Sequence, residues 1–323
     1  MPTIQPEDGQ QQPDTSDPVN PFEALRHVAL GVGITRGGAT FVPIYLPALG
    51  GPASGSIGTG DLVDLTIDEA SEESVPSVSV TNSSATPALL VEGETVSGGL
   101  QQRTFNTSIL VDARSTLQVP VSCVEAGRWR GGRAFTRGDS FAPTRVRRAK
   151  QSSVSERVEF DGERLSDQHL VWSSVEETLH DRRITSETRN IADADALFLT
   201  DQRLGAALDS LAERGPLPDQ VGVIVFHGRR PVAAEIFGST DLLRPHWTAI
   251  VRSYLIDATT TEEGSPSLDR AIRFLRRIRK ARQVTAPGVG LGVEHHLRSE
   301  RVSGQALTWD GTILHASAFA LAA

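Results

Sequence analysis

PALLVEGETVSGGLQQRTFNTSILVDARSTLQVPVSCVEAGRW occupies residues 87–129 and decides the fold class of this chain. Apolar and polar residues alternate through it in short runs, as they do in β-strands that bury one face. The runs are Leu89–Glu94, Gln101–Val111 and Leu117–Glu125. Glycine, Asp and Ser residues lie between them, and this spacing of turns is typical of antiparallel sandwiches and barrels. The stretch therefore predicts an antiparallel sheet in the first part of the chain.

The same alternation predicts how the second and third runs pair. Their apolar faces match in the register that places Arg103 opposite Glu125, and a slip by one residue would turn these faces outward. A turn at residues 96–99 would add Glu92 on the other side of Arg103, at about 5 Å between Cβ atoms. We therefore expect Arg103 on a central strand between two glutamates.

Charges placed beside an apolar face must be paired if they are buried. One interpretation is a structural network of ion pairs that closes the end of a sheet. The other is a polar cleft in which Glu92 and Glu125 act as acid and base. In that cleft, Arg103, Asn106 and Arg128 would bind the ligand. No histidine or cysteine spacing typical of a metal site occurs, so we expect no metal.

Cys123 is the only cysteine of the chain, which excludes an intrachain disulfide and makes the cytoplasm the expected compartment. It lies in an apolar run without a histidine close in sequence. We therefore expect a buried core thiol rather than a nucleophile.

Composition places the chain among globular proteins, with 323 residues, 38% hydrophobic and 22% charged. Residues 1–20 are rich in Gln, Pro and Asp, which predicts a disordered acidic tail. The longest apolar runs are too short for a spanning helix, so we expect no membrane association. A net charge of −8 makes nucleic acid an unlikely partner.

The second part of the chain changes in character. Arg128–Lys150 is basic and glycine-rich, which indicates a long connection with a domain boundary near its end. Helices capped by Ser166, Thr200 and Ser265, a hairpin at residues 220–237 and strands within residues 288–319 follow. A capping box at Thr66 also predicts one short helix inside the first part.

The predicted fold class is therefore α+β. An antiparallel β-rich domain, sandwich- or barrel-like, spans residues 21–148, and a mixed α+β part spans residues 149–323 and packs on it. The two parts could also form one continuous domain.

Several segments together resemble a known family. EGE at Glu92–Glu94, QQRTFNTS at Gln101–Ser108 and PVSCVEAGRW at Pro120–Trp129 are similar to the ARG and rhodanese-phosphatase-superfamily-associated protein domain, first type. ARG stands for ADP-ribosylglycohydrolase. Weaker similarity continues through VIVFHGRRPVAAEIFGS at residues 223–239 and GTILHASAF at residues 311–319. The resemblance covers most of the chain beyond the tail.

The resemblance implies a role in systems that handle NAD, ADP-ribose or related nucleotides, with ADP-ribosylglycohydrolase-type proteins as partners. It transfers no catalytic residue and no cofactor. Our leading hypothesis is a bacterial cytoplasmic protein that binds, with or without processing, a phosphorylated nucleotide-like ligand around Glu92, Arg103 and Glu125. The alternatives are a non-catalytic interaction protein with a structural ionic network, and a hydrolase in which Glu92 and Glu125 form the acid/base pair.

Overall fold

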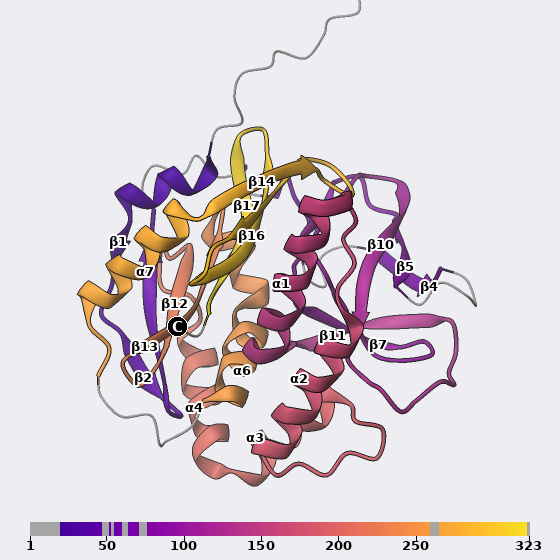
Figure 1. The fold of residues 1–323 in the computed structure, drawn as a ribbon, viewed down its shortest axis with the longest axis horizontal. Coiled ribbons are helices and arrows are strands. Elements are labelled where there is room, and N and C mark those ends of the chain that lie inside the picture. Colours follow the sequence, from indigo (N-terminus) through magenta and orange to yellow (C-terminus); the bar gives the residue numbers. More distant parts are fainter. Residues whose placement is uncertain are drawn as a thin grey trace, which may run out of the picture.

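The computed structural model describes residues 20–46, 52, 55–59, 64–70, 76–258 and 265–321. The tail predicted for residues 1–20 therefore lies outside the described residues, except for Asn20. The fold is α+β, as predicted: a barrel and a large antiparallel sheet lie side by side, with helices between and around them (Figure 1).

A closed six-stranded barrel confirms the β-rich, barrel-like first part. Its strands follow the order β10-β5-β4-β11-β7-β8. Burial alternates along β5, so that Val78 and Val80 point inward while their neighbours are half-buried. The bounds are β4 Leu65–Glu69, β5 Ser77–Asn82, β7 Glu94–Gly98, β8 Arg103–Phe105, β10 Ser115–Cys123 and β11 Ala134–Phe141. Beside the barrel, β6 (Ala88–Leu90) pairs with β9 (Ile109–Val111).

The large sheet is nine-stranded and antiparallel, in the order β1-β3-β12-β13-β17-β16-β15-β14, with β2 also paired to β3. The hairpin β12–β13 and most of the closing strands were predicted. The bounds are β1 Ala29–Leu30, β2 Ile34–Arg36, β3 Ala39–Tyr45, β12 Gly222–His227, β13 Arg230–Phe237, β14 Arg282–Pro287, β15 Val293–Arg298, β16 Val302–Trp309 and β17 Thr312–Ala320. Strands from both ends of the sequence thus build one sheet, and the division at residues 148 and 149 stays a prediction.

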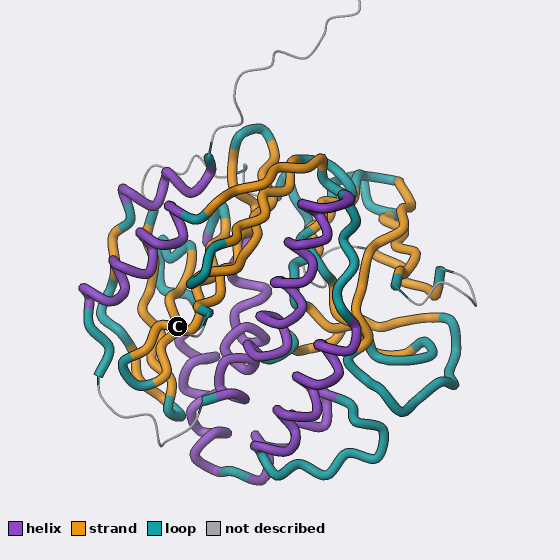
Figure 2. Tube along the Cα trace, in the orientation of Figure 1, coloured by secondary structure: helices purple, strands orange, loops and turns teal. Residues whose placement is uncertain are grey.

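Both faces of this sheet are covered at its centre: successive side chains of β12 point to opposite sides, and all of them are buried. Val223 and Val225 pack with helices α4 and α6, and Ile224 and Phe226 pack with η1 and α7. Figure 2 shows the helices around the strands. The bounds are η1 Pro21–His27, α1 Thr144–Asp161, α2 Gln168–Asp181, η3 Ile191–Ala196, α3 Leu197–Thr200, α4 Gln202–Arg214, α5 Thr240–Leu243, η4 Arg244–His246, α6 Trp247–Asp257 and α7 Leu268–Lys280.

Two sequence predictions are wrong at this level. Thr66 does not start a helix but lies in β4, because β4 pairs with β5 along its whole length. The predicted connection Arg128–Lys150 contains β11, which closes the barrel, and the start of α1. The predicted helix caps Ser166, Thr200 and Ser265 are also wrong by one or two residues. The side chains that cap these helices are Asp167, Asp201 and Ser267.

Helix α1 occupies a central position, between the barrel and the strands β15 and β16 of the large sheet (Figure 1). Its inner face carries charged and polar residues, and Arg147, Lys150 and Gln151 are fully buried. None of the helices in the described part of the chain is long and apolar enough to cross a bilayer.

Candidate functional site

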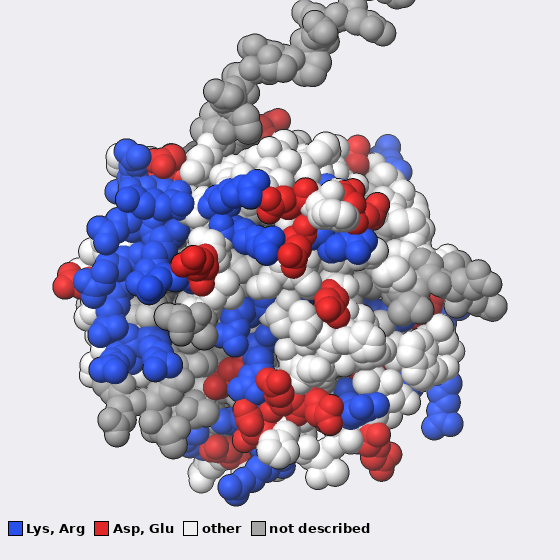
Figure 3. Space-filling model, in the orientation of Figure 1, with Lys and Arg blue, Asp and Glu red and all other residues white. Residues whose placement is uncertain are grey.

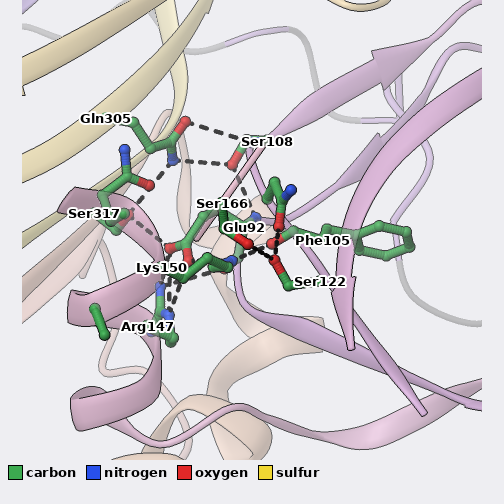
Figure 4. A network of polar contacts seen from close by, with 12 residues as sticks. Glu92, Phe105, Ser108, Ser122, Arg147, Lys150, Ser166, Gln305 and Ser317 are labelled. Carbon is green, nitrogen blue, oxygen red and sulfur yellow. Dashed lines mark hydrogen bonds and ion pairs between the residues drawn. The ribbon is translucent and has the colours of Figure 1, made fainter. Parts of the chain in front are cut away.

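A buried carboxylate lies at the centre of the molecule. Glu92 belongs to the loop between β6 and β7 and is fully buried. Arg147 and Lys150 reach it from α1 (Figure 4): Arg147 Nη2 lies 2.7 Å from Glu92 Oε2, and Lys150 Nζ lies 2.8 Å from Glu92 Oε1. The hydroxyl of Ser317, on β17, donates to Oε2 at 2.9 Å. Two separate elements, α1 and β17, therefore hold one carboxylate.

The glycine of the EGE segment makes this contact possible. Gly93 has φ +92°, a conformation that residues with a side chain rarely adopt. A Cβ built there would overlap the guanidinium of Arg147. Gly93 thus admits both the turn and the close approach of the arginine.

The other end of Arg147 holds a second buried carboxylate, Glu235 of β13. Arg147 Nη1 and the Tyr254 hydroxyl each lie 2.5 Å from Glu235 Oε1. His315 Nε2 lies 3.0 Å from Glu235 Oε2, and its Nδ1 lies 2.7 Å from the hydroxyl of Ser108. We refer to Glu92, Arg147, Lys150, Glu235, Tyr254, His315, Ser108 and Ser317 as the central network.

The charges of the central network compensate one another. Burial alone would raise the pKa of Glu92, but the charges of Arg147 and Lys150 lower it to about 2. Burial also opposes ionisation of Glu235, but the charge of Arg147 and the hydrogen bond from His315 together lower the pKa of that carboxyl. Burial lowers the pKa of His315, which keeps its ring neutral. Both carboxylates are therefore ionised acceptors.

Arg103 lies elsewhere. On β8 it lies opposite Cys123 of the neighbouring strand β10 and Val96 of the neighbouring strand β7, so the predicted register with Glu125 is wrong. Its guanidinium contacts Gln101 Oε1 at 3.1 Å and lies 3.6 Å from a carboxylate oxygen of Glu69. The predicted strand Gln101–Val111 is in fact two strands, because residues 106–108 bend away from β10 and β9 pairs with β6.

Asn106 and Cys123 are both buried near this bend. Asn106 donates to the carbonyl of Arg164 at 2.8 Å and accepts from the Ser122 hydroxyl at 2.5 Å. Cys123 is a free thiol, buried as predicted, and burial raises its pKa to about 11. Its thiolate is scarce at neutral pH, which is unfavourable for a nucleophile.

Glu125 and Arg128 form a pair of their own at the end of β10. Arg128 Nη2 lies 2.8 Å from Glu125 Oε2. Glu125 also accepts from the backbone N–H of Gln102 at 3.0 Å and from the Thr188 hydroxyl at 2.8 Å. Burial works against its ionisation, but the hydrogen bonds from Arg128, Gln102 and Thr188 lower its pKa.

Apart from the pair Glu125–Arg128, the predicted site residues are therefore not brought together. Among the described residues, no hydrogen bond or ion pair joins Glu92 to Arg103 or to Glu125. Arg103, Asn106 and the pair Glu125–Arg128 belong to the barrel and its rim, whereas Glu92 belongs to the central network. Their catalytic and ligand-binding roles stay predictions.

An open cleft lies beside the Glu125 pair. Its volume is about 1140 Å³, and its walls are the loop 182–188, the segment 192–200, part of α4 and Arg252 of α6. Residues 188–191 run along the end of β10, where Gly127 N–H donates to the Thr188 carbonyl at 2.7 Å. Glu125 holds the Thr188 hydroxyl in this wall. Glu125 therefore fixes the position of Thr188 in the cleft wall.

Two arginines of the cleft are incompletely paired. The Nε atoms of Arg182 and Arg252 are buried, and neither finds an acceptor within the described ranges. Arg182 donates from Nη1 to the Ala258 carbonyl at 3.0 Å, and burial lowers its pKa. Arg252 lies 3.5 Å from Asp195, and its guanidinium carbon stands 5.4 Å from the centre of the Phe198 ring. The cleft thus combines cations with an aromatic face.

Comparison with protein families confirms the resemblance. The family model ARPP-1, the ARG and Rhodanese-Phosphatase-superfamily-associated Protein domain, matches residues 31–319. The chain belongs to this family. Comparison with curated proteins and with solved structures gave no match.

In this ARPP-1 chain, sequence reasoning missed much of the central network. Arg147 and Lys150 share one face of α1 because they are three residues apart. A helix prediction over Thr144–Asp161 would have placed them together, but a partner 55 residues away leaves no local pattern. Where the structure describes the ARPP-1 chain, no three His, Cys, Asp or Glu side chains converge as a metal site requires.

Proposed function

We propose that the protein binds a phosphorylated, nucleotide-like ligand of the ADP-ribose or NAD type in the cleft beside Glu125. The observation that carries this proposal is the presence of Arg182 and Arg252, both incompletely paired, in one open cleft. A guanidinium group presents a fork of donors that matches phosphate oxygens. Both side chains are only partly buried, so a phosphate in the cleft would accept hydrogen bonds from their exposed guanidinium nitrogens.

The remaining walls suit the other parts of a nucleotide. Phe198 offers a ring on which a base can stack. Arg252 already packs over this ring, so the ring accepts a flat, stacked group. Asp193, Asp209 and Glu187 offer acceptors for ribose hydroxyl groups. The cleft, at about 1140 Å³, is large enough for a dinucleotide, since ligand pockets range over about 300–1,000 Å³.

Family membership supports the same ligand class, because the family is named after proteins that include ADP-ribosylglycohydrolase. We extend the proposal to a function in the cytoplasm, on the basis of one buried, unpaired thiol, and to partners of the ADP-ribosylglycohydrolase type. In this arrangement Glu125 and Arg128 support the cleft wall, whereas the sequence predicted that they take part in catalysis and ligand binding.

The accessory, non-catalytic hypothesis is favoured over the hydrolase by one specific observation. A carboxyl that donates a proton near neutral pH needs a raised pKa. The pKa of Glu92 is lowered to about 2, and that of Glu125 is lowered as well. We therefore propose binding without acid/base catalysis by this pair.

Isothermal titration calorimetry with ADP-ribose, NAD and AMP tests the proposal. The double variant Arg182→Gln, Arg252→Gln should bind at least about tenfold more weakly, since a hydrogen bond to a charged group is worth about 1.5–3 kcal/mol. Arg244→Gln, an exposed arginine of η4, serves as the control and should bind like the wild type. Absence of binding by the wild type, or equal binding by the double variant, would overturn the proposal.

A further inference from the structure

One surface of the molecule is strongly basic although the whole chain carries a net charge of −8. It lies over α7, at the left of Figures 1 and 3, where lysine and arginine side chains gather. We define the basic face by its exposed side chains: Arg270, Arg273, Arg276, Arg277 and Lys280 of α7, and Arg301 of the turn between β15 and β16.

No acidic side chain of the described residues forms an ion pair with the cations of the basic face. Within the described ranges, none of these side chains makes an ion pair or a hydrogen bond; the nearby pairs of Glu23 involve Arg26 and Arg279. Asp269 and Glu300 are the acidic residues closest in sequence. Among the described residues, the face therefore presents an excess of positive charge to solvent.

Helix stability does not explain this arrangement. Cations near the C-terminus of a helix are favourable, which accounts for Arg277 and Lys280. Arg270 and Arg273 lie in the first two turns of α7, where the helix dipole disfavours positive charge. Repulsion between cations spaced three and four residues apart adds to that cost.

The basic face also contains a groove. A hollow of about 340 Å³ is lined by Arg276, Arg277, Lys280 and Arg301, together with Ser299 and Glu300. Arginine and lysine side chains around a concave surface form a suitable seat for a phosphate group. Along the helix, Arg270, Arg273, Arg277 and Lys280 recur every three or four residues, so a row of cations leads away from this groove.

The position of the apolar residues argues against a bilayer as the partner. A helix that lies on a membrane inserts its apolar face between the lipids. In α7 that face, formed by Ala271, Phe274, Leu275 and Ile278, is buried against the large sheet. The cations occupy the outward side, and the exposed Leu268 and Ile272 lie to one flank of them.

We propose that the basic face binds the phosphodiester backbone of a nucleic acid without reading its sequence. The low expectation for nucleic acid rested on the net charge of the whole chain. Charges farther away than a Debye length of about 10 Å are screened, so the local cations decide the contact. This inference is independent of the ligand proposed for the cleft, which the calorimetric experiment tests separately.

Fluorescence anisotropy with labelled single-stranded RNA, single-stranded DNA and duplex DNA tests the proposal, at about 50 mM and about 200 mM salt. The triple variant Arg273→Gln, Arg277→Gln, Lys280→Gln should lose at least about tenfold in affinity at the lower salt. On single strands, the plot of log affinity against log salt should become less steep by about 2, because each of the three lost phosphate contacts contributes about 0.7 to its slope. Comparison of the three probes shows which nucleic acid supplies the backbone.

The matched control is Arg130→Gln, Arg229→Gln, Arg244→Gln, which removes the same charge from exposed positions on other elements. It should keep the affinity and the slope of the wild type. No binding of any probe by the wild type at the lower salt would overturn the proposal, as would an equal loss in both triple variants. Binding to phosphatidylserine vesicles in the absence of oligonucleotide binding would also overturn it, in favour of a membrane.

Discussion

Glu92 Oε2 lies 2.7 Å from Arg147 Nη2, and both side chains are fully buried. The carboxylate comes from a loop at the barrel and the guanidinium from α1. Replacing a buried ion pair with apolar residues can be neutral, but removing one partner leaves a charge without compensation. This pair therefore predicts large effects for single substitutions.

The variant Glu92→Gln should be strongly destabilised. It keeps the size of the side chain but leaves Arg147 and Lys150 with one carboxylate fewer between them. We expect the free energy of unfolding, measured by urea titration, to fall by about 3–5 kcal/mol. Glu300→Gln, at an exposed position, should change it by no more than about 0.5 kcal/mol. A loss of less than about 1 kcal/mol for Glu92→Gln would show that the network is not stabilising.

The variant Gly93→Ala should also unfold more easily, by about 2 kcal/mol or more, because it adds a Cβ at φ +92° against the Arg147 guanidinium. Gly132→Ala is the control, since a Cβ there meets no atom within 4 Å. Thermal denaturation of the two variants side by side measures the difference. Equal melting temperatures would contradict the close approach described here.

Stability should fall steeply in acid. A carboxyl whose pKa is lower in the folded state stabilises the fold above its unfolded pKa, and this contribution is lost as the pH falls toward the folded value. Glu94 is a second such group, because the charges of Arg137 and His246 beside it outweigh its burial and lower its pKa to about 2. For Glu92 and Glu94 the window therefore runs from about 4.5 down to about 2. Each should contribute about 3 kcal/mol. Urea titrations across this range measure the loss, and Glu92→Gln should show a visibly shallower decline than the wild type.

His315 should be neutral at pH 7, because burial lowers its pKa, and carry its proton on Nε2. Glu235 is an ionised acceptor 3.0 Å from Nε2, so that nitrogen must donate, while Nδ1 accepts from Ser108. Long-range ¹⁵N–¹H correlation spectra distinguish the tautomers directly. A doubly protonated ring at pH 7, or a proton on Nδ1 in the neutral ring, would contradict the assignment.

Cys123 should resist thiol reagents in the native protein. It is buried, and burial raises its pKa to about 11, so both access and ionisation are limited. Reaction with a chromogenic disulfide at pH 8 should be slow in buffer and immediate in denaturant. Equally fast reaction in both conditions would mean that the strand β10 opens readily.

The sequence allowed correct prediction of elements whose partners are local. β12 and β13 were predicted because apolar residues alternate on both sides of a tight turn at Gly228. The burial of Cys123 was predicted from its apolar run. The α+β class followed from the order of these patterns.

Predictions failed where a distant partner decides the structure. The run containing Arg103 was expected to be one strand, but Ser108 turns toward His315, which lies 207 residues farther along the chain. Arg147 and Lys150 lie in a basic segment that was predicted to be a linker. They are buried because they pair with Glu92, which lies 55 residues before Arg147. Alternation of apolar and polar residues predicts which face of a strand a side chain lies on, but it does not predict which distant residue that side chain contacts.

The central network also constrains the order in which the protein can form during translation. Glu92 is synthesised well before α1, and Ser317 follows it by 225 residues. A nascent chain that has emerged only as far as the barrel therefore has a carboxylate without its counter-ions, and desolvating it would be costly. The charge of Glu92 can therefore be compensated only after α1 has been synthesised, and its last hydrogen bond forms only after β17 has left the ribosome.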